Sequence, residues 1–299
     1  MVTEFWNKRK VATNILGILV FLISLITTGT LFKFVFKDLN TRFISLVAVF
    51  VASVFTVQFF DKKSLHWLGI GFHTWVLREC VLGFAFGFVV ASLACLPSLF
   101  FIEKMSMNLN IVSAPLSFIF NSFLLSVVLR FAWAILEELT YRGYLFQRSI
   151  EIFGVGVSTL SFALLFAVSH LWNPDSNWLS SLNTFLAGIF FSLMYIKSGS
   201  LFMPIFAHAT WNCVLGDLFG LPVSGLNNLL GSNLMTIKLA TTNSTQNLFI
   251  TGGDYGPEQS LVCSIALLLG IIFLAKSKLV RVSPYVYARV FDLQKSNEN

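Results

Sequence analysis

Long apolar runs constrain the fold of this chain more than any other feature. A helix needs about 20 apolar residues to cross the hydrocarbon core of a bilayer. Runs of that kind lie near residues 11–36, 43–60, 80–102, 116–136, 178–196 and 261–275, and two shorter ones lie near 157–170 and 201–216. The sequence therefore predicts an all-α fold, a polytopic membrane bundle of about eight transmembrane helices around a buried intramembrane polar site.

Composition agrees with this class. Hydrophobic residues make up 56% of the chain and charged residues only 11%, whereas about a quarter of the residues in a soluble domain are charged. The first apolar run is too long for the h-region of a signal peptide and lacks a small-residue cleavage pattern after it, so we expect it to be the first span. The four cysteines lack the paired spacing of a disulfide framework or a thiolate metal site.

Charge distribution predicts the topology. The net charge is +6, but the basic residues sit between and after apolar runs and do not form a nucleic-acid-binding face. The positive-inside rule is satisfied with both termini in the cytoplasm, as expected for an integral protein of a bacterial plasma membrane. Fourteen basic residues then lie inside: Lys8, Arg9, Lys10, Lys62, Lys63, Arg78, Arg142, Arg148, Lys197, Lys276, Lys278, Arg281, Arg289 and Lys295. Five lie outside, namely Lys33, Lys37, Arg42, Lys104 and Lys238, and Arg130 falls within a span.

The chain divides into four segments of one bundle. Residues 1–115 are expected to form the N-terminal transmembrane helices, and residues 116–216 a core that contains the polar motifs. Residues 217–260, rich in Asn, Gly, Ser and Thr, are predicted to be an extracytoplasmic loop. Residues 261–299 would form the last transmembrane helix and a basic cytoplasmic tail that contacts anionic membrane lipid.

Two adjacent acids follow the apolar run 116–136. An ionisable group inside a membrane costs at least about 2.5 kcal/mol, so it persists when it is buried, paired or useful. Glu138 and Arg142 lie one helical turn apart in the acid-first order that favours pairing. Glu137 points about 100° away, towards the face of Tyr141, and is available for chemistry. The alternative is that both acids only mark the cytoplasmic end of a span.

Two histidines lie in the next apolar segments. His170 follows Phe166 by one turn, and His208 precedes Asn212 by one turn on the same helix face. Singly, His170 could be an interfacial residue, and His208 with Asn212 a satisfied buried hydrogen bond. Together with Glu137 they supply a carboxylate, two imidazoles and an amide, which can activate water, hold a metal ion or stabilise an oxyanion. HExxH and GxSxG motifs are both missing from the sequence, so soluble zincin and serine-hydrolase classes are not indicated.

The order and spacing of these residues resemble the three motifs of the CPBP family. This family includes the type II CAAX prenyl endopeptidases and the bacterial Abi, or bacteriocin-immunity, proteins. The resemblance covers about residues 116–216 and rests on Glu137-Glu138-x-x-x-Arg142, Phe166-x-x-x-His170 and His208-x-x-x-Asn212. It implies an intramembrane endopeptidase with a helical core, whose active site lies inside the bilayer, opens towards the cytoplasm and accepts a membrane-associated peptide or lipidated-protein substrate.

The resemblance also implies roles for individual residues. Glu137 would be the water-activating base with His170 as its partner, and His208 with Asn212 would polarise the scissile carbonyl. The catalytic set it implies is Glu137, Glu138, His170, His208 and Asn212, supported by Arg142 and Phe166. The reaction could depend on a metal such as zinc, ligated by Glu137, His170 and His208, or could be metal-free with the glutamate and a histidine activating water.

Two other function classes compete with the protease. A non-catalytic binding or immunity protein could retain the motifs as a structural polar core. A proton-coupled transporter would need broken helices in matching halves and an internal repeat, and the sequence has neither. The protease also sets a geometric condition, because simple spans place Glu137 at the inner membrane edge and His170 towards the outer one. For them to meet, the helix must continue past Glu137 to about Phe146, and the short helix must start deeper or tilt.

Overall fold

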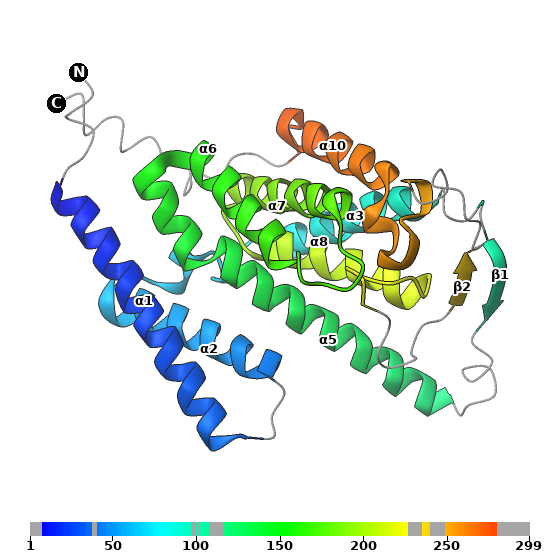
Figure 1. Cartoon of the computed structure of the whole chain (residues 1–299). Helices are drawn as coiled ribbons and strands as arrows, with labels where there is room; N and C mark the ends of the chain where they lie inside the picture. Colours follow the sequence, from blue (N-terminus) through cyan, green and yellow to red (C-terminus); the bar gives the residue numbers. More distant parts are fainter. Residues whose placement is uncertain are drawn as a thin grey trace.

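The computed structural model describes residues 8–37, 41–96, 100, 102–107, 116–226, 235–239 and 249–279. These residues form a helical bundle (Figure 1). Its α-helices are α1 (Lys8–Val35), α2 (Thr41–Phe55), α3 (Val76–Cys95), α5 (Leu116–Arg142), α6 (Tyr144–Ser169), α7 (Trp178–Ser198), α8 (Phe202–Asn212) and α10 (Leu261–Lys276). Two π-helical segments continue α2 and α8, η1 (Thr56–Phe60) and η4 (Cys213–Leu218). Three short 3₁₀-helices are η2 (Leu65–Leu68), η5 (Gly253–Tyr255) and η6 (Pro257–Gln259).

Several helices are built to lie in a membrane. Five described segments are long and apolar enough to cross one: Val11–Val35, Phe43–Phe60, Val76–Cys95, Phe120–Ser169 and Trp178–Ser198. The prediction of a polytopic membrane protein is confirmed, but the predicted number of about eight spans is not confirmed. The fourth segment contains both α5 and α6, while α8 has 11 residues and α10 has 16, fewer than the roughly 20 that a span requires.

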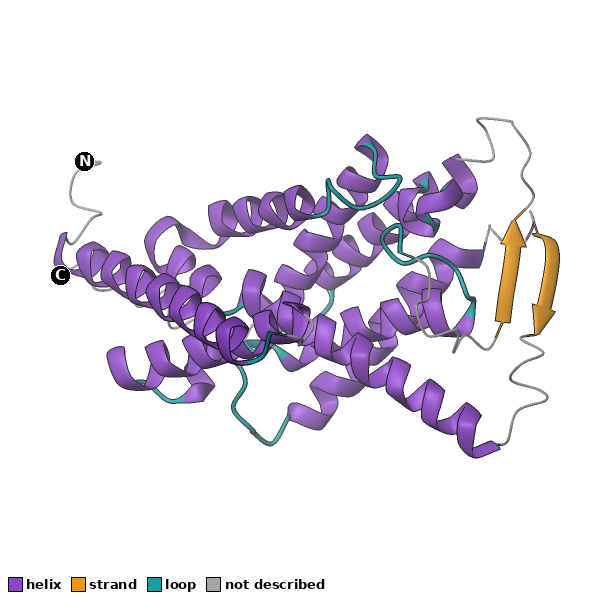
Figure 2. Ribbon diagram, turned by 60° about the horizontal axis from the view of Figure 1, so that its bottom comes forward, coloured by secondary structure: helices purple, strands orange, loops and turns teal. Residues whose placement is uncertain are grey.

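One small sheet departs from the all-α prediction. Strands β1 (Ile102–Met107) and β2 (Met235–Leu239) pair antiparallel, with Lys104 opposite Lys238. Figure 2 shows the sheet at one end of the bundle. It joins the connection after α3 to the segment 217–260. Strand pairing between residues so far apart in sequence leaves no mark on the pattern of apolar runs, which is why the sequence did not predict it.

The connection from α5 to α6 brings the first two motifs together. Helix α5 continues past Glu137 but ends at Arg142, four residues before the predicted Phe146. A Cβ atom at Gly143 would lie 2.1 Å from the Leu139 carbonyl oxygen, so this tight turn requires glycine. Helix α6 starts at Tyr144, well before the predicted residue 157.

Helix α6 is broken in the middle. Gly154 has φ 79° and ψ 170°, which interrupts the helix inside the range Tyr144–Ser169. This conformation is open to glycine and strained for residues with a side chain. The break changes the direction of the second half, which ends at His170 near α5. The condition set by the sequence, that Glu137 and His170 must meet, is satisfied by this early start and break.

Two hydrophobic clusters hold the helices. The first, here the outer cluster, joins α3, α7, α8 and α10 and includes Val90, Phe190, Met194, Met203, Trp211 and Leu267. The second, here the inner cluster, joins α1, α2, α5, α6 and the junction of α7 with α8, and includes Phe21, Leu139, Tyr144, Phe146, Tyr195 and Leu201. Large hydrophobic side chains also cover the outside of α1 and α6, as expected for helices that face lipid.

The bundle has two chemically different ends. At one end, here the basic end, Arg78 donates to the Leu279 carbonyl at 2.8 Å and Lys197 to the Ser277 carbonyl at 2.8 Å. This end contains the starts of α1, α3, α6 and α8 and the ends of α5, α7 and α10. The opposite end, here the sheet end, contains the sheet, the starts of α5 and α7, and residues 219–226 and 249–260 (Figure 1).

Candidate active site

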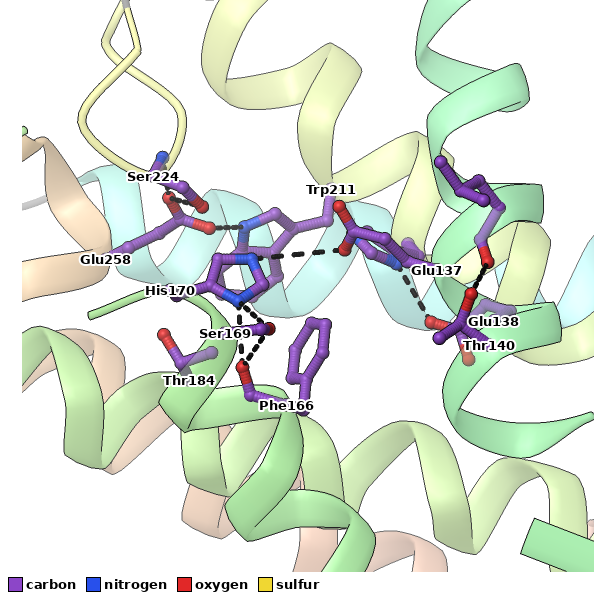
Figure 3. Close-up of polar contacts among 12 residues, drawn as sticks. Glu137, Glu138, Thr140, Phe166, Ser169, His170, Thr184, Trp211, Ser224 and Glu258 are labelled. Atoms are coloured by element: carbon purple, nitrogen blue, oxygen red, sulfur yellow. Dashed lines mark hydrogen bonds and ion pairs between the residues drawn. The ribbon is translucent and has the colours of Figure 1, made fainter. Parts of the chain in front are cut away.

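Three polar side chains from different helices converge inside the bundle (Figure 3). Glu137 comes from α5, His170 follows the last residue of α6, and His208 comes from α8. Glu137 Oε2 lies 3.6 Å from His208 Nε2 and 4.0 Å from His170 Nε2. This oxygen is buried and accepts no hydrogen bond from the described residues. Both histidines predicted as site residues therefore face the same unsatisfied carboxylate oxygen.

The hydrogen bond made by Nδ1 fixes the tautomer of each imidazole. His170 Nδ1 lies 2.8 Å from the Phe166 carbonyl oxygen, and His208 Nδ1 lies 2.9 Å from Glu138 Oε1. A carbonyl and an ionised carboxylate only accept hydrogen bonds, so both Nδ1 atoms carry hydrogen. In the neutral rings each Nε2 then presents its lone pair towards Glu137. Each ring is ready to accept a proton or to ligate a metal ion.

The second acid of the motif has a partner. Glu138 Oε1 lies 3.3 Å from Arg142 Nη1, and both side chains are 0% exposed. Arg142 also donates to the Gly188 carbonyl at 2.9 Å and to Ser192 Oγ at 3.4 Å, which ties α5 to α7. The predicted pairing of Glu138 with Arg142 is confirmed. Glu138 does not line the cavity described below, so it contacts the site through His208.

Aromatic rings hold both imidazoles in place. Phe191 stacks on His208 with 4.9 Å between ring centroids and 14° between planes. Phe166 meets His170 edge to face at 4.7 Å, and the Arg142 guanidinium lies 4.8 Å from the Phe166 ring. Locked rings of this kind keep functional groups in one orientation.

A cavity of about 410 Å³ contains the three groups, a size typical of ligand pockets. Its wall combines polar, aliphatic and aromatic side chains, and the aromatic ones are Phe43, Trp133, Tyr141, Phe166, Phe191 and Trp211. Asn212 also lines it, one turn after His208 and only 7% exposed. The Asn212 side chain makes no hydrogen bond to the described residues, so its amide is available to a molecule in the cavity.

An ion pair on the cavity wall was not predicted. Arg130 Nε lies 3.0 Å from Asp217 Oδ2, and Ser126 Oγ donates to Asp217 Oδ1 at 2.7 Å. The Arg130 and Asp217 side chains are 7% and 1% exposed. Arg130 was recognisable in the sequence as an ionisable residue within a span. Its partner was not, because Asp217 stands where the polar segment 217–260 begins.

Glu258 is a second feature that sequence reasoning missed. Its Oε1 accepts from Trp211 Nε1 at 2.9 Å, and its Oε2 accepts from the backbone N–H and the hydroxyl of Ser224. Asn183 donates to the Glu258 carbonyl at 2.8 Å. Residues 219–226 and 249–260, predicted as part of a loop, are thereby fixed to α7 and α8 and border the cavity.

The donor set fits zinc in chemistry. Two imidazole nitrogens, one carboxylate and an open position make up a catalytic zinc site, and hydrogen-bonded Nδ1 atoms are typical of metal-binding histidines. Within the described ranges, however, no three His, Cys, Asp or Glu residues are grouped so that they could hold a metal ion. The three side chains are thus of the types that bind zinc, but their donor atoms lie farther apart than in a preformed metal site. If zinc binds, its ligands would be Glu137, His170 and His208.

Comparison with known proteins supplies the family. Residues 118–214 match a family model described as Rce1-like, type II CAAX prenyl endopeptidase. This segment is an Rce1-like domain. It runs from α5 into η4 and contains every residue predicted for the site, which confirms the assignment to the CPBP and CAAX protease family. The family is one of CAAX-type intramembrane proteases, hence of hydrolases. No curated protein matches the chain.

The matched segment leaves out part of the observed cavity. The match ends at residue 214, before Asp217 and well before Glu258, and it begins after α3. The convergence of Glu137, His170, His208 and Asn212 thus belongs to the Rce1-like domain. The parts of the cavity wall that come from α2, residues 223–226, η6 and α10 lie outside the matched segment.

Proposed function

We propose that this protein is an intramembrane endopeptidase that hydrolyses a peptide bond in a membrane-associated peptide or lipidated protein. The observation that carries the proposal is the position of Glu137 Oε2, buried, without a hydrogen bond, and facing the bare Nε2 atoms of His170 and His208. Amide hydrolysis needs water made nucleophilic and a developing oxyanion stabilised. The cavity offers groups for both tasks within one small volume.

Glu137 is the general base in this proposal. The gaps of 3.6 and 4.0 Å to the two Nε2 atoms are too long for direct hydrogen bonds. An oxygen of water or of the substrate that lies beside the line joining these atoms can be within hydrogen-bond distance of the carboxylate and of an imidazole at the same time. Glu137 removes a proton from the water molecule whose oxygen attacks the scissile carbonyl carbon. The neutral His170, whose Nδ1–H is anchored on the Phe166 carbonyl, takes up that proton at Nε2 and gives it to the amine nitrogen as the C–N bond breaks.

His208 and Asn212 are the carbonyl-binding groups. The Asn212 amide can donate to the carbonyl oxygen of the scissile bond as negative charge develops there. His208 can donate from Nε2 only as an imidazolium, because its Nδ1–H is already directed at Glu138. Glu138 is therefore a positioning residue, which sets the orientation of His208, and Arg142 compensates its charge. Phe166 supports His170.

The metal-dependent form of the reaction uses the same side chains. A zinc ion held by Glu137, His170 and His208 would supply Lewis-acid polarisation of the carbonyl and of water. In the metal-free form Glu137 and His170 act directly. Chelation separates the two forms experimentally.

The test is peptide cleavage by the detergent-purified full chain. We would use two probes of the same sequence, a farnesylated peptide with a CAAX-type C-terminus and its unprenylated form, each with and without chelator. Glu137→Gln keeps the size of the side chain and removes the base, so we expect kcat to fall by about 10²–10⁴-fold, the usual contribution of a general base. Asp254→Asn, which changes an exposed acid, is the matched control.

Each outcome decides between functions. Loss of cleavage in Glu137→Gln, with unchanged elution and melting and with an active Asp254→Asn control, supports the protease. Cleavage that also stops on chelation assigns the metal-dependent form. Equal cleavage by Glu137→Gln and wild type refutes the assignment of Glu137. If no purified variant cleaves either probe, yet wild type binds them, the non-catalytic binding protein is favoured.

A further inference from the structure

Glu258 is an acid on the cavity wall that the proposed reaction does not use. Of the acidic residues that the structure describes, only Glu137 and Glu258 line the cavity. In the view of Figure 3 the Trp211 indole, which also lines the cavity, lies between the two carboxylates. Glu258 belongs to η6, outside the segment that matches the family model. Its role therefore follows from its surroundings in this chain.

The charge of Glu258 is held by neutral donors alone. Trp211 Nε1 donates to its Oε1, and the backbone N–H and the hydroxyl of Ser224 donate to its Oε2. Both oxygens accept, as in an ionised carboxylate. Among the described residues no lysine, arginine or histidine forms an ion pair with Glu258. The neighbouring segments 219–226 and 249–260 contain neither lysine nor arginine. A negative charge therefore remains on this part of the wall.

The other charges of the cavity are balanced or can be. Arg130 is the only lysine or arginine among the described lining residues, and its guanidinium pairs with Asp217. Glu137 faces two imidazoles, either of which can take up a proton. Glu258 has neither kind of partner. The wall thus carries an excess of negative charge, and surroundings of low dielectric strengthen its attraction for a cation.

Glu258 is fixed in place before any ligand binds. Asn183 of α7 donates to the carbonyl oxygens of Glu258 and Ser260, both at 2.8 Å. The Ser260 hydroxyl accepts from the Cys263 N–H at 3.0 Å and caps the N-terminus of α10. Through these bonds and the one from Trp211, the Glu258 segment is attached to α7, α8 and α10. A group held in this way loses little conformational entropy when it binds a ligand.

We infer that Glu258 is a specificity-determining residue, which binds a lysine or arginine side chain of the substrate close to the scissile bond. The inference rests on the proposed protease function and specifies its substrate class, a membrane-associated polypeptide with a cationic residue within two positions of the cleaved bond. A cavity of about 410 Å³ is roughly 7 Å wide, and an extended chain advances about 3.3–3.6 Å per residue. Two residues therefore span it.

Glu258 and Trp211 together suit a cation. Among the described residues Glu258 Oε1 accepts one hydrogen bond, from Trp211, and a carboxylate oxygen has a second lone-pair site. The face of an indole ring attracts ammonium and guanidinium groups. A cation inside a membrane protein requires a compensating charge, and Glu258 supplies it. An acidic side chain at the same position would meet an unbalanced carboxylate and be repelled.

Peptide binding tests the inference without cleavage. The full chain carrying Glu137→Gln, which removes the other carboxylate of the cavity, would be titrated in detergent with the unprenylated probe of the cleavage assay. The probe carries a fluorophore, and Kd is measured by fluorescence anisotropy. Each position of the probe in turn carries lysine, norleucine, which has a similar length but no charge, or glutamate. The bond cleaved by the wild type is located by mass spectrometry of the products.

Within two positions of that bond, lysine should bind about tenfold or more tightly than norleucine, and glutamate more weakly, because close charge pairs in interfaces contribute at least that much. Adding Glu258→Gln should bring the ratio of the lysine and norleucine Kd values close to one. Two control variants should leave this ratio unchanged: Ser224→Ala, which keeps the charge of Glu258, and Asp254→Asn, which neutralises an exposed acid.

Equal binding of lysine and norleucine at every position would overturn the inference, as would a ratio that persists in Glu258→Gln. Equal weakening of all three peptides by Glu258→Gln would show a purely structural role and would also overturn it. A carbodiimide, which joins an amine to a carboxylate, gives a second readout if Glu258→Gln does not fold. The bound lysine peptide should be cross-linked to Glu258, and a cross-link to Asp175 or Asp254 alone would refute the assignment. Failure of cleavage is a separate result, because the binding measurements cover every position of the probe and need no cleavage.

Discussion

Glu138 connects the ion pair to the catalytic imidazole, so its replacement is the most informative test of the architecture. Glutamine keeps the shape of the side chain but removes its charge, while Arg142 stays 0% exposed. Removing one partner of a buried ion pair costs about 3–5 kcal/mol, because the other charge is left uncompensated. Glu138→Gln should therefore lower the free energy of unfolding by that amount, a fall in Tm on the order of 10 °C by the scaling for folded domains of this size.

A double-mutant cycle assigns this loss to the pair. Thermal unfolding in detergent would be measured for wild type, Glu138→Gln, Arg142→Gln and the double variant. Since the double variant buries no unpaired charge at this place, it should lose less than the two single losses combined, by up to about 3 kcal/mol. Asp254→Asn, an exposed acid, should change stability by less than about 0.5 kcal/mol.

Activity adds a second readout to the same variants. His208 Nδ1 lies 2.9 Å from Glu138 Oε1, and a glutamine can present its amide N–H₂ there, which reverses the tautomer. We expect Glu138→Gln to lower kcat of peptide cleavage more than KM changes, at a temperature where the variant is folded. If Glu138→Gln melts within 1 °C of wild type, or if the double-variant loss equals the combined single losses, the reasoning about this pair is refuted.

Three further substitutions test other parts of the structure. Asp217→Asn leaves Arg130 buried beside a neutral amide. It should lower the free energy of unfolding, measured by thermal unfolding, by about 3–5 kcal/mol. Ser126→Ala removes one hydrogen bond to the same carboxylate and should cost less, about 1.5–3 kcal/mol; the opposite ranking would contradict the charge argument. Gly154→Ala should destabilise α6 by about 1–3 kcal/mol, because its φ of 79° and ψ of 170° lie in a region that only glycine adopts without strain. Gly156→Ala is the control, because a Cβ atom at Gly156 also meets no atom within 4 Å, and it should leave the free energy of unfolding unchanged or raise it. Equal changes in that free energy at the two glycines would show that the break in α6 is absent.

Sequence reasoning succeeded wherever helical periodicity alone fixes a direction. The pairing of Glu138 with Arg142 follows from a spacing of four residues, and so does the placement of Glu137 and Tyr141 on the cavity face. The long apolar runs likewise predicted both ends of α1 and α7 to within three residues. They predicted the start of α5, whose end lies six residues beyond the run. Helix-face spacing and the length of an apolar run are local properties, because each depends only on residues that are close in the sequence.

The parts that sequence reasoning missed depend on packing between distant segments. Glu258 reaches Trp211 across 47 residues, and β1 pairs with β2 across more than a hundred. The early start of α6 was hidden because the polar residues Arg148 and Glu151 look like a break between spans. In the structure Arg148 is 3% exposed and pairs with Glu151 at 2.8 Å, so a charged pair continues the helix that we expected it to interrupt. Bacterial origin, the lipid contacts of the tail and the substrate stay predictions, and residues 280–299 of that tail lie outside the described ranges.

The long sequence separation of the Arg130–Asp217 pair also bears on biogenesis. Glu138–Arg142 and Arg148–Glu151 are four and three residues apart, so these charges can neutralise one another as soon as the α5–α6 hairpin leaves the ribosome. Arg130 precedes Asp217 by 87 residues, which at about 5–20 residues per second takes roughly 4–17 seconds to synthesise. During that interval the Asp217 carboxylate that compensates the Arg130 guanidinium in the folded chain has not been made. The pair forms only after η4 is synthesised, so the closing of this part of the cavity wall is a late step of assembly.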